Sequence, residues 1–184
     1  MRIRYNAPVT LTFTLISTGV LLLHALTGGT LIYRFFSIGP SLDTSRPVEY
    51  VRLFTHVLGH ADWNHLLSNF AFILLLGPIL EEKHGSSGLF VMVLITALVT
   101  GVLNVLLLPT GLLGASGIVF MMILLGSFTN FGKGDIPLTF ILVVALYLTR
   151  EFITAFQADS ISQFAHIVGG FCGGLFGFLR PRKT

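Results

Sequence analysis

Two polar residues lie near the beginnings of two apolar segments of the sequence. Ser116 belongs to the string Gly-Ala-Ser-Gly at 114–117, and His166 belongs to the string Ala-His-Ile-Val-Gly at 165–169. Polar and ionisable side chains within membrane-spanning segments are costly and are often functional. A serine whose proton is taken by a histidine is a base-activated nucleophile. If the two segments face each other at one depth, the pair predicts hydrolytic chemistry inside a bilayer.

The composition is that of a membrane protein. Of the 184 residues, 53% are hydrophobic and 10% are charged, whereas soluble domains carry about 25% charged residues. The formal net charge is +3, and the basic residues are spread over loops and tails, which indicates membrane orientation rather than nucleic-acid binding. The length fits one domain over residues 1–184. The single cysteine, Cys172, has no partner for an intramolecular disulfide.

Six apolar stretches are each near the roughly 20 residues that a helix needs to span a bilayer. We therefore predict an all-α membrane protein, a bundle of six transmembrane helices. The predicted spans are residues 8–26, 63–80, 89–108, 116–131, 136–152 and 162–179. The first span lacks a small-x-small cleavage site, so we expect a retained helix rather than a signal peptide.

The basic residues predict the orientation of this bundle. Six spans place both termini on one side of the membrane, and that side collects seven basic residues: Arg2, Arg4, Lys83, Lys133, Arg180, Arg182 and Lys183. The other side has four: Arg34, Arg46, Arg52 and Arg150. Because cytoplasmic loops carry the excess of lysine and arginine, we expect both termini in the cytoplasm, in a plasma (inner) membrane.

This topology brings polar residues of three spans to a similar depth, because the second, fourth and sixth spans all run from outside to inside. His65 and Asn69 lie four residues apart and so share one face of the second span. Ser116 begins the fourth span, where unpaired amides and the helix dipole favour a developing oxyanion. His166 is the candidate base, and His65 and Asn69 are candidate oxyanion donors. No carboxylate is evident near His166, so we expect a dyad.

Glycines of the sixth span form a face in line with the histidine. Gly169, Gly173 and Gly177 follow His166 at spacings of three, four and four residues. Small residues at this spacing let two membrane helices approach closely. Gly117 directly follows the serine, so we expect the close contact between the fourth and sixth spans that a Ser–His hydrogen bond needs.

Three strings of the sequence resemble the rhomboid family of intramembrane serine proteases. They are His-Ala-Asp-Trp-Asn-His-Leu-Leu-Ser-Asn at 60–69, Gly-Ala-Ser-Gly at 114–117 and Ala-His-Ile-Val-Gly-Gly at 165–170. The resemblance covers roughly residues 49 to 179 and implies the family's six-helix core. It implies Ser116 as nucleophile and His166 as general base. The implied oxyanion and substrate-binding residues are His65, Asn69 and Gly114, and the supporting residues are Gly117, Gly169, Gly173, Glu81, Arg52 and Phe120.

Two positions depart from the family's pattern. Val51 precedes Arg52 where the family often has tryptophan, so the aromatic contact is missing while the arginine is kept. Phe120 stands where some members have a tyrosine stacked on the catalytic histidine, so this side chain can stack but offers no hydroxyl. Glu81 and Gly85 match the family's Glu-x-x-x-Gly at the cytoplasmic end of the second helix, which implies a structural role.

Competing chemistries fit the sequence less well. A G-x-S-x-G nucleophile elbow requires glycine where the chain has Ile118. A metalloprotease would show H-E-x-x-H; segment 56–60 lacks the glutamate, although its two histidines leave a metal site open. An aspartyl intramembrane protease needs two aspartates within spans, and the aspartates here fall in loops or at span edges. We expect no cofactor and no metal.

The sequence therefore predicts an intramembrane serine endopeptidase. Its expected partners are transmembrane protein substrates and the lipid bilayer. Because a helix hides its own carbonyls, we expect substrates whose helix is locally weak near the outer surface. The first loop, 27–62, is expected to lie partly in the outer leaflet, and the loop 153–161 is expected to act as a lid over His166. Two alternatives remain: a non-catalytic chaperone or scaffold of the same fold, and a transporter. The Ser116→Ala substitution distinguishes them from a protease, because it should abolish activity only if the protein is a serine protease.

Overall fold

The computed structural model of the chain describes residues 4–127 and 160–179, together with residues 138, 141, 142, 145, 146 and 149. In these residues the regular structure is helical, with one isolated antiparallel bridge between Ile38 and Leu112. The elements in chain order are α1 (Pro8–Leu26), α2 (Leu31–Phe35), α3 (Pro47–Thr55), the 3₁₀ helix η1 (His56–Leu58), α4 (Trp63–His84), α5 (Ser86–Leu107), α6 (Ser116–Ser127) and α8 (Ser160–Leu179).

Five of the predicted spans correspond to helices of the structure. Helix α1 has the predicted bounds, while α4 runs four residues further than predicted and α5 begins three residues earlier. Helices α6 and α8 begin at Ser116 and Ser160. Most of the predicted fifth span, 136–152, lies outside the described residues, so the count of six spans stays a prediction.

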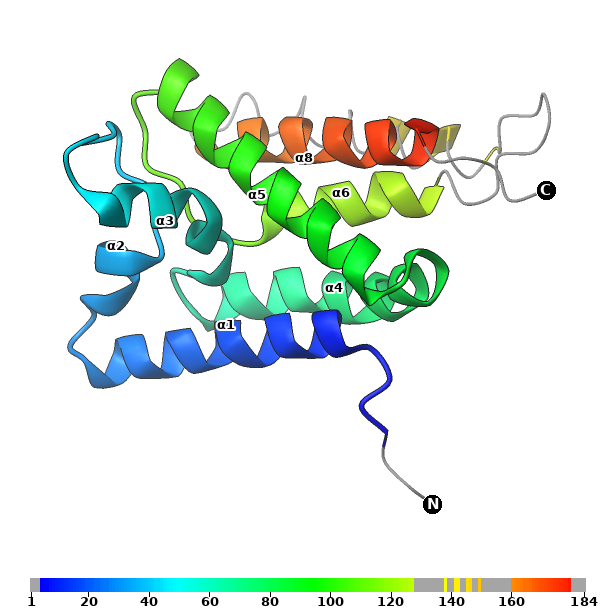
Figure 1. The fold of residues 1–184 in the computed structure, drawn as a ribbon, viewed down its shortest axis with the longest axis horizontal. Helices are drawn as coiled ribbons and strands as arrows, with labels where there is room; N and C mark the ends of the chain where they lie inside the picture. Colours follow the sequence, from blue (N-terminus) through cyan, green and yellow to red (C-terminus); the bar gives the residue numbers. More distant parts are fainter. Residues whose placement is uncertain are drawn as a thin grey trace.

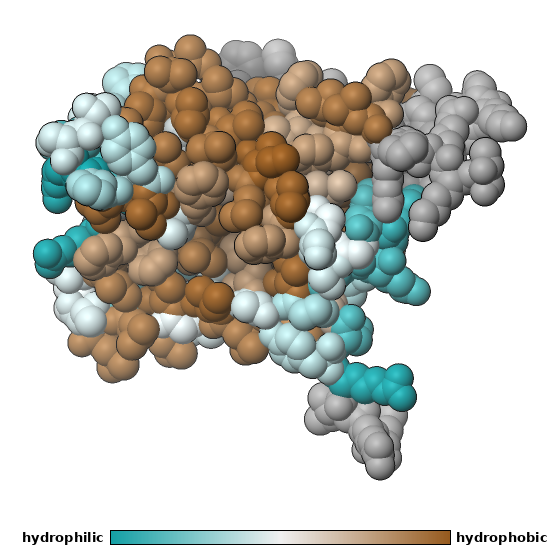
Figure 2. Space-filling view, viewed as in Figure 1, coloured by the Kyte–Doolittle hydropathy of each residue, from teal (hydrophilic) through white to brown (hydrophobic). Residues whose placement is uncertain are grey.

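Helices α1, α4 and α5 are each long and apolar enough to cross a membrane. The described part of α6 has 12 residues, about 18 Å at 1.5 Å per residue, and is therefore shorter than the hydrocarbon core of a bilayer. Figure 2 shows hydrophobic side chains over the middle of one face, with polar side chains gathered towards its two ends. The chain is an integral membrane protein.

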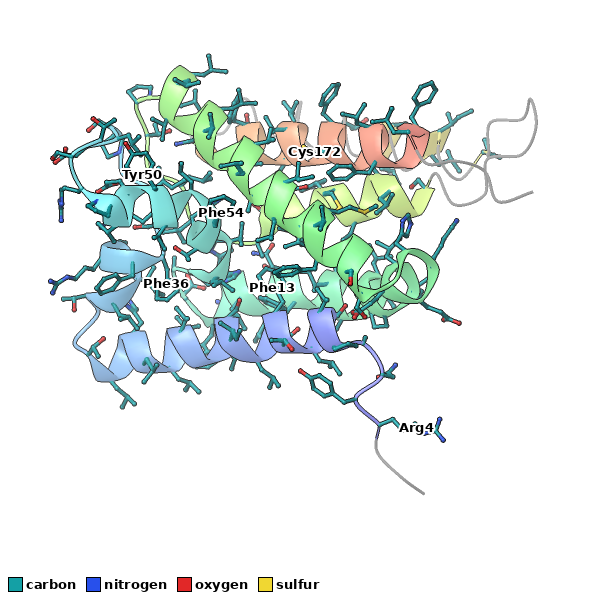
Figure 3. The ribbon with its side chains drawn as sticks, in the orientation of Figure 1. Arg4, Phe13, Phe36, Tyr50, Phe54 and Cys172 are labelled. Carbon is teal, nitrogen blue, oxygen red and sulfur yellow. The ribbon has the colours of Figure 1, made fainter. Side chains whose placement is uncertain are left out.

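The long helices are arranged so that one end of the molecule carries the polar residues of interest. Helices α1, α4, α6 and α8 lie in a row, and α5 crosses them obliquely and contacts α4, α6 and α8 (Figure 1). Helices α4, α6 and α8 begin at the same end, where the first loop gathers, and α6 begins closer to the middle of the molecule than the other two. Phe13 of α1 packs on Phe70 of α4 with ring centroids 5.2 Å apart (Figure 3).

Local signals explain where the helices begin and end. Pro8 stands in the first turn of α1, where its missing N–H costs nothing. Asp62 caps α4, because its Oδ1 accepts from the His65 N–H at 2.8 Å. Gly85, at φ 73°, joins α4 to α5 in a backbone conformation that favours glycine.

The first loop contains α2, α3 and η1, which the sequence interpretation as one long loop did not predict. Helix α3 is amphipathic: Glu49 and Leu53 are buried, whereas Tyr50 and Phe54 are exposed. Its buried side packs against α5 at Gly101, where a Cβ atom would lie 3.0 Å from the Leu53 carbonyl oxygen. These helices are short, and helices of this length depend on tertiary contacts for their stability.

Candidate active site

The helices that carry Ser116 and His166 contact each other along their backbones. A Cβ atom added to Gly169 of α8 would lie 2.8 Å from the Cα of Gly117 in α6 and would overlap the carbonyl oxygen of Gly117. One turn further on, a Cβ atom added to Gly173 would lie 2.9 Å from the Cα of Met121. Neither position has room for a side chain, so glycine is what lets α6 and α8 come this close.

Further contacts on the same two helices bracket Ser116 and His166. One turn after Ser116, the Phe120 ring packs on the His166 ring with centroids 4.2 Å apart. On the other side, a Cβ atom at Gly117 would lie 3.2 Å from the carbonyl oxygen of Ala165. His166 is 6% exposed and Ser116 is half-buried. The two residues therefore lie at the same level of the α6–α8 interface.

The turn before Ser116 has a backbone shape that requires glycine. Gly114 has φ +111°, which side-chain-bearing residues rarely adopt. A Cβ atom at Gly114 would also lie 2.6 Å from Cε1 and 2.7 Å from Nε2 of His65. The His65 imidazole thus lies directly over the Gly114 backbone, beside the N-terminus of α6. The Gly114 N–H donates to the His56 carbonyl oxygen at 2.9 Å.

Asn69 lies one turn after His65 on α4 and is 6% exposed. Within the part of the chain that the structure describes, its side-chain Nδ2 is buried and has no hydrogen-bond partner. A buried amide without a partner is costly unless a ligand or water satisfies it. His65 is half-buried, and its Nδ1 accepts a long hydrogen bond of 3.5 Å from the Ala61 N–H. Its Nε2 is the ring nitrogen that lies nearer to Gly114.

His56 and His60 hold the same region from the first loop. The Ala115 N–H donates to Nε2 of His60 at 3.3 Å, and the Nε2 of His56 lies 3.4 Å from Oγ1 of Thr100 on α5. Burial lowers the pKa of each imidazole to about 4, so both are neutral at physiological pH. The two do not share a helical face, since η1 ends at Leu58 and His60 lies beyond it. Their partners could not be found from the sequence because they lie 44 and 55 residues away in the chain.

Two of the residues predicted as supports, Glu81 and Arg52, lie further from this centre. Both carboxylate oxygens of Glu81, near the end of α4, accept hydrogen bonds from the beginning of α1: the Val9 N–H at 2.9 Å, the Thr10 N–H at 3.1 Å and the Thr10 hydroxyl at 2.9 Å. A carboxylate of one helix thus caps another. Arg52 of α3 forms an ion pair with Glu49 and donates to the Arg34 carbonyl oxygen at the end of α2.

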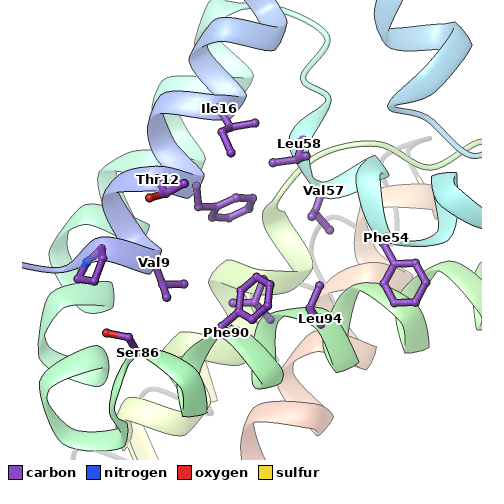
Figure 4. A pocket seen from close by; sticks show the side chains of 12 residues that line it. Val9, Thr12, Ile16, Phe54, Val57, Leu58, Ser86, Phe90 and Leu94 are labelled. Atoms are coloured by element: carbon purple, nitrogen blue, oxygen red, sulfur yellow. The ribbon is translucent and has the colours of Figure 1, made fainter.

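The described residues contain no metal site, and their apolar pocket lies away from Ser116 and His166. Among them, no group of three or more histidine, cysteine, aspartate or glutamate side chains is arranged to hold a metal ion. An apolar pocket of about 380 Å³ lies between α1, α5 and the first loop, with Phe54 and Phe90 in its wall (Figure 4). It contains none of the predicted site residues. Almost all of the predicted lid, 153–161, lies outside the described residues.

Comparisons with known proteins show which family the sequence belongs to. A sequence profile described as the Rhomboid domain matches residues 47–183. The chain is 28% identical over 130 residues to "Rhomboid-like protein 11, chloroplastic" of Arabidopsis thaliana, an alignment that covers 62% of this chain and 46% of that protein, so the chain spans about half of that relative. It is 24% identical over 134 residues to "Rhomboid protease GlpG" of Haemophilus influenzae, covering 71% of this chain and 70% of that protein. Because the profile extends over well more than half of its length, the chain belongs to the rhomboid family.

Proposed function

We propose that this protein is an intramembrane serine endopeptidase that uses Ser116 and His166 as a catalytic dyad. The observation that supports this most is the backbone contact between α6 and α8 at Gly117 and Gly169, with the Phe120 ring stacked on His166. A nucleophile and its base need fixed geometry, and helices that touch along their backbones are a rigid way to provide it. The protease name of the relative from Haemophilus influenzae points the same way.

The proposed reaction begins with attack of the Ser116 Oγ on the carbonyl carbon of a peptide bond. His166 accepts the hydroxyl proton as the new C–O bond forms, and the carbonyl electrons move onto the oxygen. The tetrahedral intermediate collapses, the C–N bond breaks, and the imidazolium returns its proton to the leaving amine. Water activated by the same histidine then hydrolyses the acyl-enzyme and restores Ser116.

Three kinds of donor would stabilise the oxyanion. The first amides of α6 have no partner within their own helix, and the helix dipole favours negative charge there. The His65 Nε2 lies over the turn that precedes α6 and can donate when it carries the ring proton, and the Asn69 Nδ2 is buried without a partner in the described residues. Loss of one oxyanion donor typically costs about 3–4 kcal/mol of transition-state stabilisation.

The proposed substrates are transmembrane helices of other proteins. We propose that both termini are cytoplasmic, in a plasma (inner) membrane, so that the site opens towards the outer leaflet. The fold supports a site below the membrane surface, because α6 begins closer to the middle of the molecule than α4 and α8. A regular helix engages its own carbonyls, so a segment with small or helix-breaking residues would reach Ser116 most readily.

Labelling of the purified protein by a fluorophosphonate tests the proposal without knowledge of the natural substrate. Wild-type protein is expected to label, and both Ser116→Ala and His166→Ala are expected to abolish labelling. Ser127→Ala is the matched control, because Ser127 lies three turns after Ser116 on α6 and its hydroxyl donates to the Ile123 carbonyl oxygen at 2.8 Å. Thermal unfolding in detergent confirms that each variant is folded.

Cleavage of a test transmembrane substrate in proteoliposomes separates a protease from a non-catalytic scaffold. A protease releases product only with Ser116 and His166 in place, and Asn69→Ala is expected to lower kcat by about 10²- to 10³-fold. Equal product from wild-type protein and Ser116→Ala, or no labelling of folded wild-type protein, would show that this proposal is wrong.

A further inference from the structure

His60 lies at the junction of the first loop and the turn before Ser116, and its side chain has no exposed surface. Its Nε2 accepts from the Ala115 N–H at 3.3 Å, and its Nδ1 lies 3.3 Å from the Leu58 carbonyl oxygen. The ring also stacks edge-on against the His65 ring, with centroids 5.0 Å apart. No role in the proposed chemistry has so far been given to this residue.

The two polar partners of His60 fix its protonation state. A backbone N–H can only donate, so Nε2 must present a lone pair to Ala115. A carbonyl oxygen can only accept, so Nδ1 must carry the proton that goes to Leu58. Both hydrogen bonds exist together in one form of the ring, the neutral tautomer with the proton on Nδ1. Burial favours the same neutral form.

The amide that His60 binds directly precedes the nucleophile. Ala115 is fully buried, so its N–H has no access to bulk water. The preceding amide, that of Gly114, is held by the His56 carbonyl oxygen. The next amide along the chain is that of Ser116, at the first position of α6, where helical N–H groups have no partner within their own helix. If Ala115 lost its acceptor, the buried N–H would be unsatisfied, and the backbone would have to rotate to find another partner.

We propose that His60 is a positioning residue for the nucleophile: its neutral imidazole holds the Ala115 amide and so sets the backbone that carries Ser116. His60 does not touch the substrate in this scheme. It acts through one backbone hydrogen bond, whereas His65 and His166 act on the reacting atoms. The inference rests on the proposed function, because it assigns His60 a part in that same reaction.

Two amide substitutions separate positioning from space-filling. The side-chain oxygen of His60→Gln reaches about as far as Nε2 and can still accept from the Ala115 N–H. The shorter side chain of His60→Asn reaches only about as far as Nδ1, so it keeps the Leu58 partner and loses Ala115. Both variants remove the ring contacts with His65 and Phe70. A purely packing role predicts a larger loss of stability in His60→Asn, which removes one more methylene group, but no separate effect on kcat or on the Ala115 amide.

The experiment compares kcat, KM and thermal unfolding of the two variants in full-length protein on one test transmembrane substrate. We expect His60→Asn to have a kcat on the order of tenfold to a hundredfold below that of His60→Gln, because small displacements of a nucleophile have effects of this size. KM is expected to agree within about twofold, since substrate contacts are unchanged. Equal kcat values in two folded variants would overturn the proposal.

Amide hydrogen exchange at Ala115 gives a readout that does not depend on catalysis. Exchange is expected to be faster in His60→Asn than in His60→Gln and wild-type protein, and equal rates would overturn the assignment. If folded wild-type protein neither cleaves nor labels, the proposed protease function fails. In that case hydrogen exchange at Ala115 still tests whether His60 binds the Ala115 amide. Faster exchange in His60→Asn than in His60→Gln would support the hydrogen bond.

Discussion

Replacing Gly169 with alanine tests whether the close approach of α6 and α8 is what makes the site work. In an ordinary helix this change is stabilising by up to about 1 kcal/mol, because alanine has the higher helix propensity. Here the new Cβ atom would lie 2.8 Å from the Cα of Gly117, where ordinary contacts begin at 3.4 Å, and would overlap the Gly117 carbonyl oxygen. Since backbone atoms cannot move aside as a side chain can, the helices must separate by roughly 1 Å.

Separation of this size is expected to destabilise the protein by about 1–3 kcal/mol. It is also expected to lower the rate of fluorophosphonate labelling by about a hundredfold, because Ser116 and His166 move apart with their helices. Gly126→Ala is the matched control on α6, since a Cβ atom there meets no atom of the described residues within 4 Å; the stability of this variant should be unchanged or slightly raised. Gly173→Ala creates the same kind of overlap one turn further from His166, so it should cost similar stability with a smaller loss of rate.

The assay measures initial labelling rate and thermal unfolding in detergent for the three variants side by side. A folded Gly169→Ala protein that labels within about threefold of the wild-type rate would refute the reasoning, since the clash would then be relieved without moving the dyad. A Gly126→Ala protein as impaired as Gly169→Ala would also refute it, because the effect would then not depend on the contact between the two helices.

Three further perturbations follow from the described contacts. Glu81→Gln should lower the free energy of unfolding by about 1.5–3 kcal/mol through loss of the charged cap on α1, whereas exposed Glu82→Gln should change it little; equal thermal shifts would contradict the capping role. Gly114→Ala combines a positive φ with a clash against the ring over it, and should cost about 1–3 kcal/mol together with most of the labelling; wild-type labelling in that variant would be the contrary result. The free energy of unfolding should also fall as the pH falls from 6.5 to about 4, by about 1.4 kcal/mol per pH unit for each histidine, because in this range His56 and His60 are protonated in the unfolded state and neutral in the folded state. His60→Gln should reduce the slope of the unfolding free energy against pH by the share of one histidine. An unchanged slope would contradict this prediction.

The long helices could be read from the sequence because their causes are local. Pro8 provides the first turn of α1, and the glycines at positions 28 and 29 follow its end, so the predicted and observed bounds agree. Hydropathy misplaced the end of α4, which runs on through Glu81 to His84. The apolar stretch predicts only the part of α4 that contacts lipid. The helix continues beyond it because Glu81, in its charged last turn, accepts hydrogen bonds from the beginning of α1.

The short helices of the first loop and the role of His60 could not be read in this way. Helices α2 and α3 are joined by the Arg52 side chain, which reaches the Arg34 carbonyl oxygen 18 residues earlier. The bond between His60 and Ala115 joins residues 55 apart and is made by a backbone amide, which leaves no trace in the residue types. The contact between α6 and α8, in contrast, could be predicted, because the spacing of the glycines on α8 is typical of closely packed membrane helices.

The order of α6 and α8 along the chain has a consequence for biosynthesis. A ribosome delivers the serine-bearing helix to the membrane before the histidine-bearing helix, and the two meet only when the glycine face of α8 docks on Gly117 and Met121. A nascent chain would therefore carry the proposed nucleophile without its base. The proposed dyad would be complete only after α8 has entered the membrane and packed against α6.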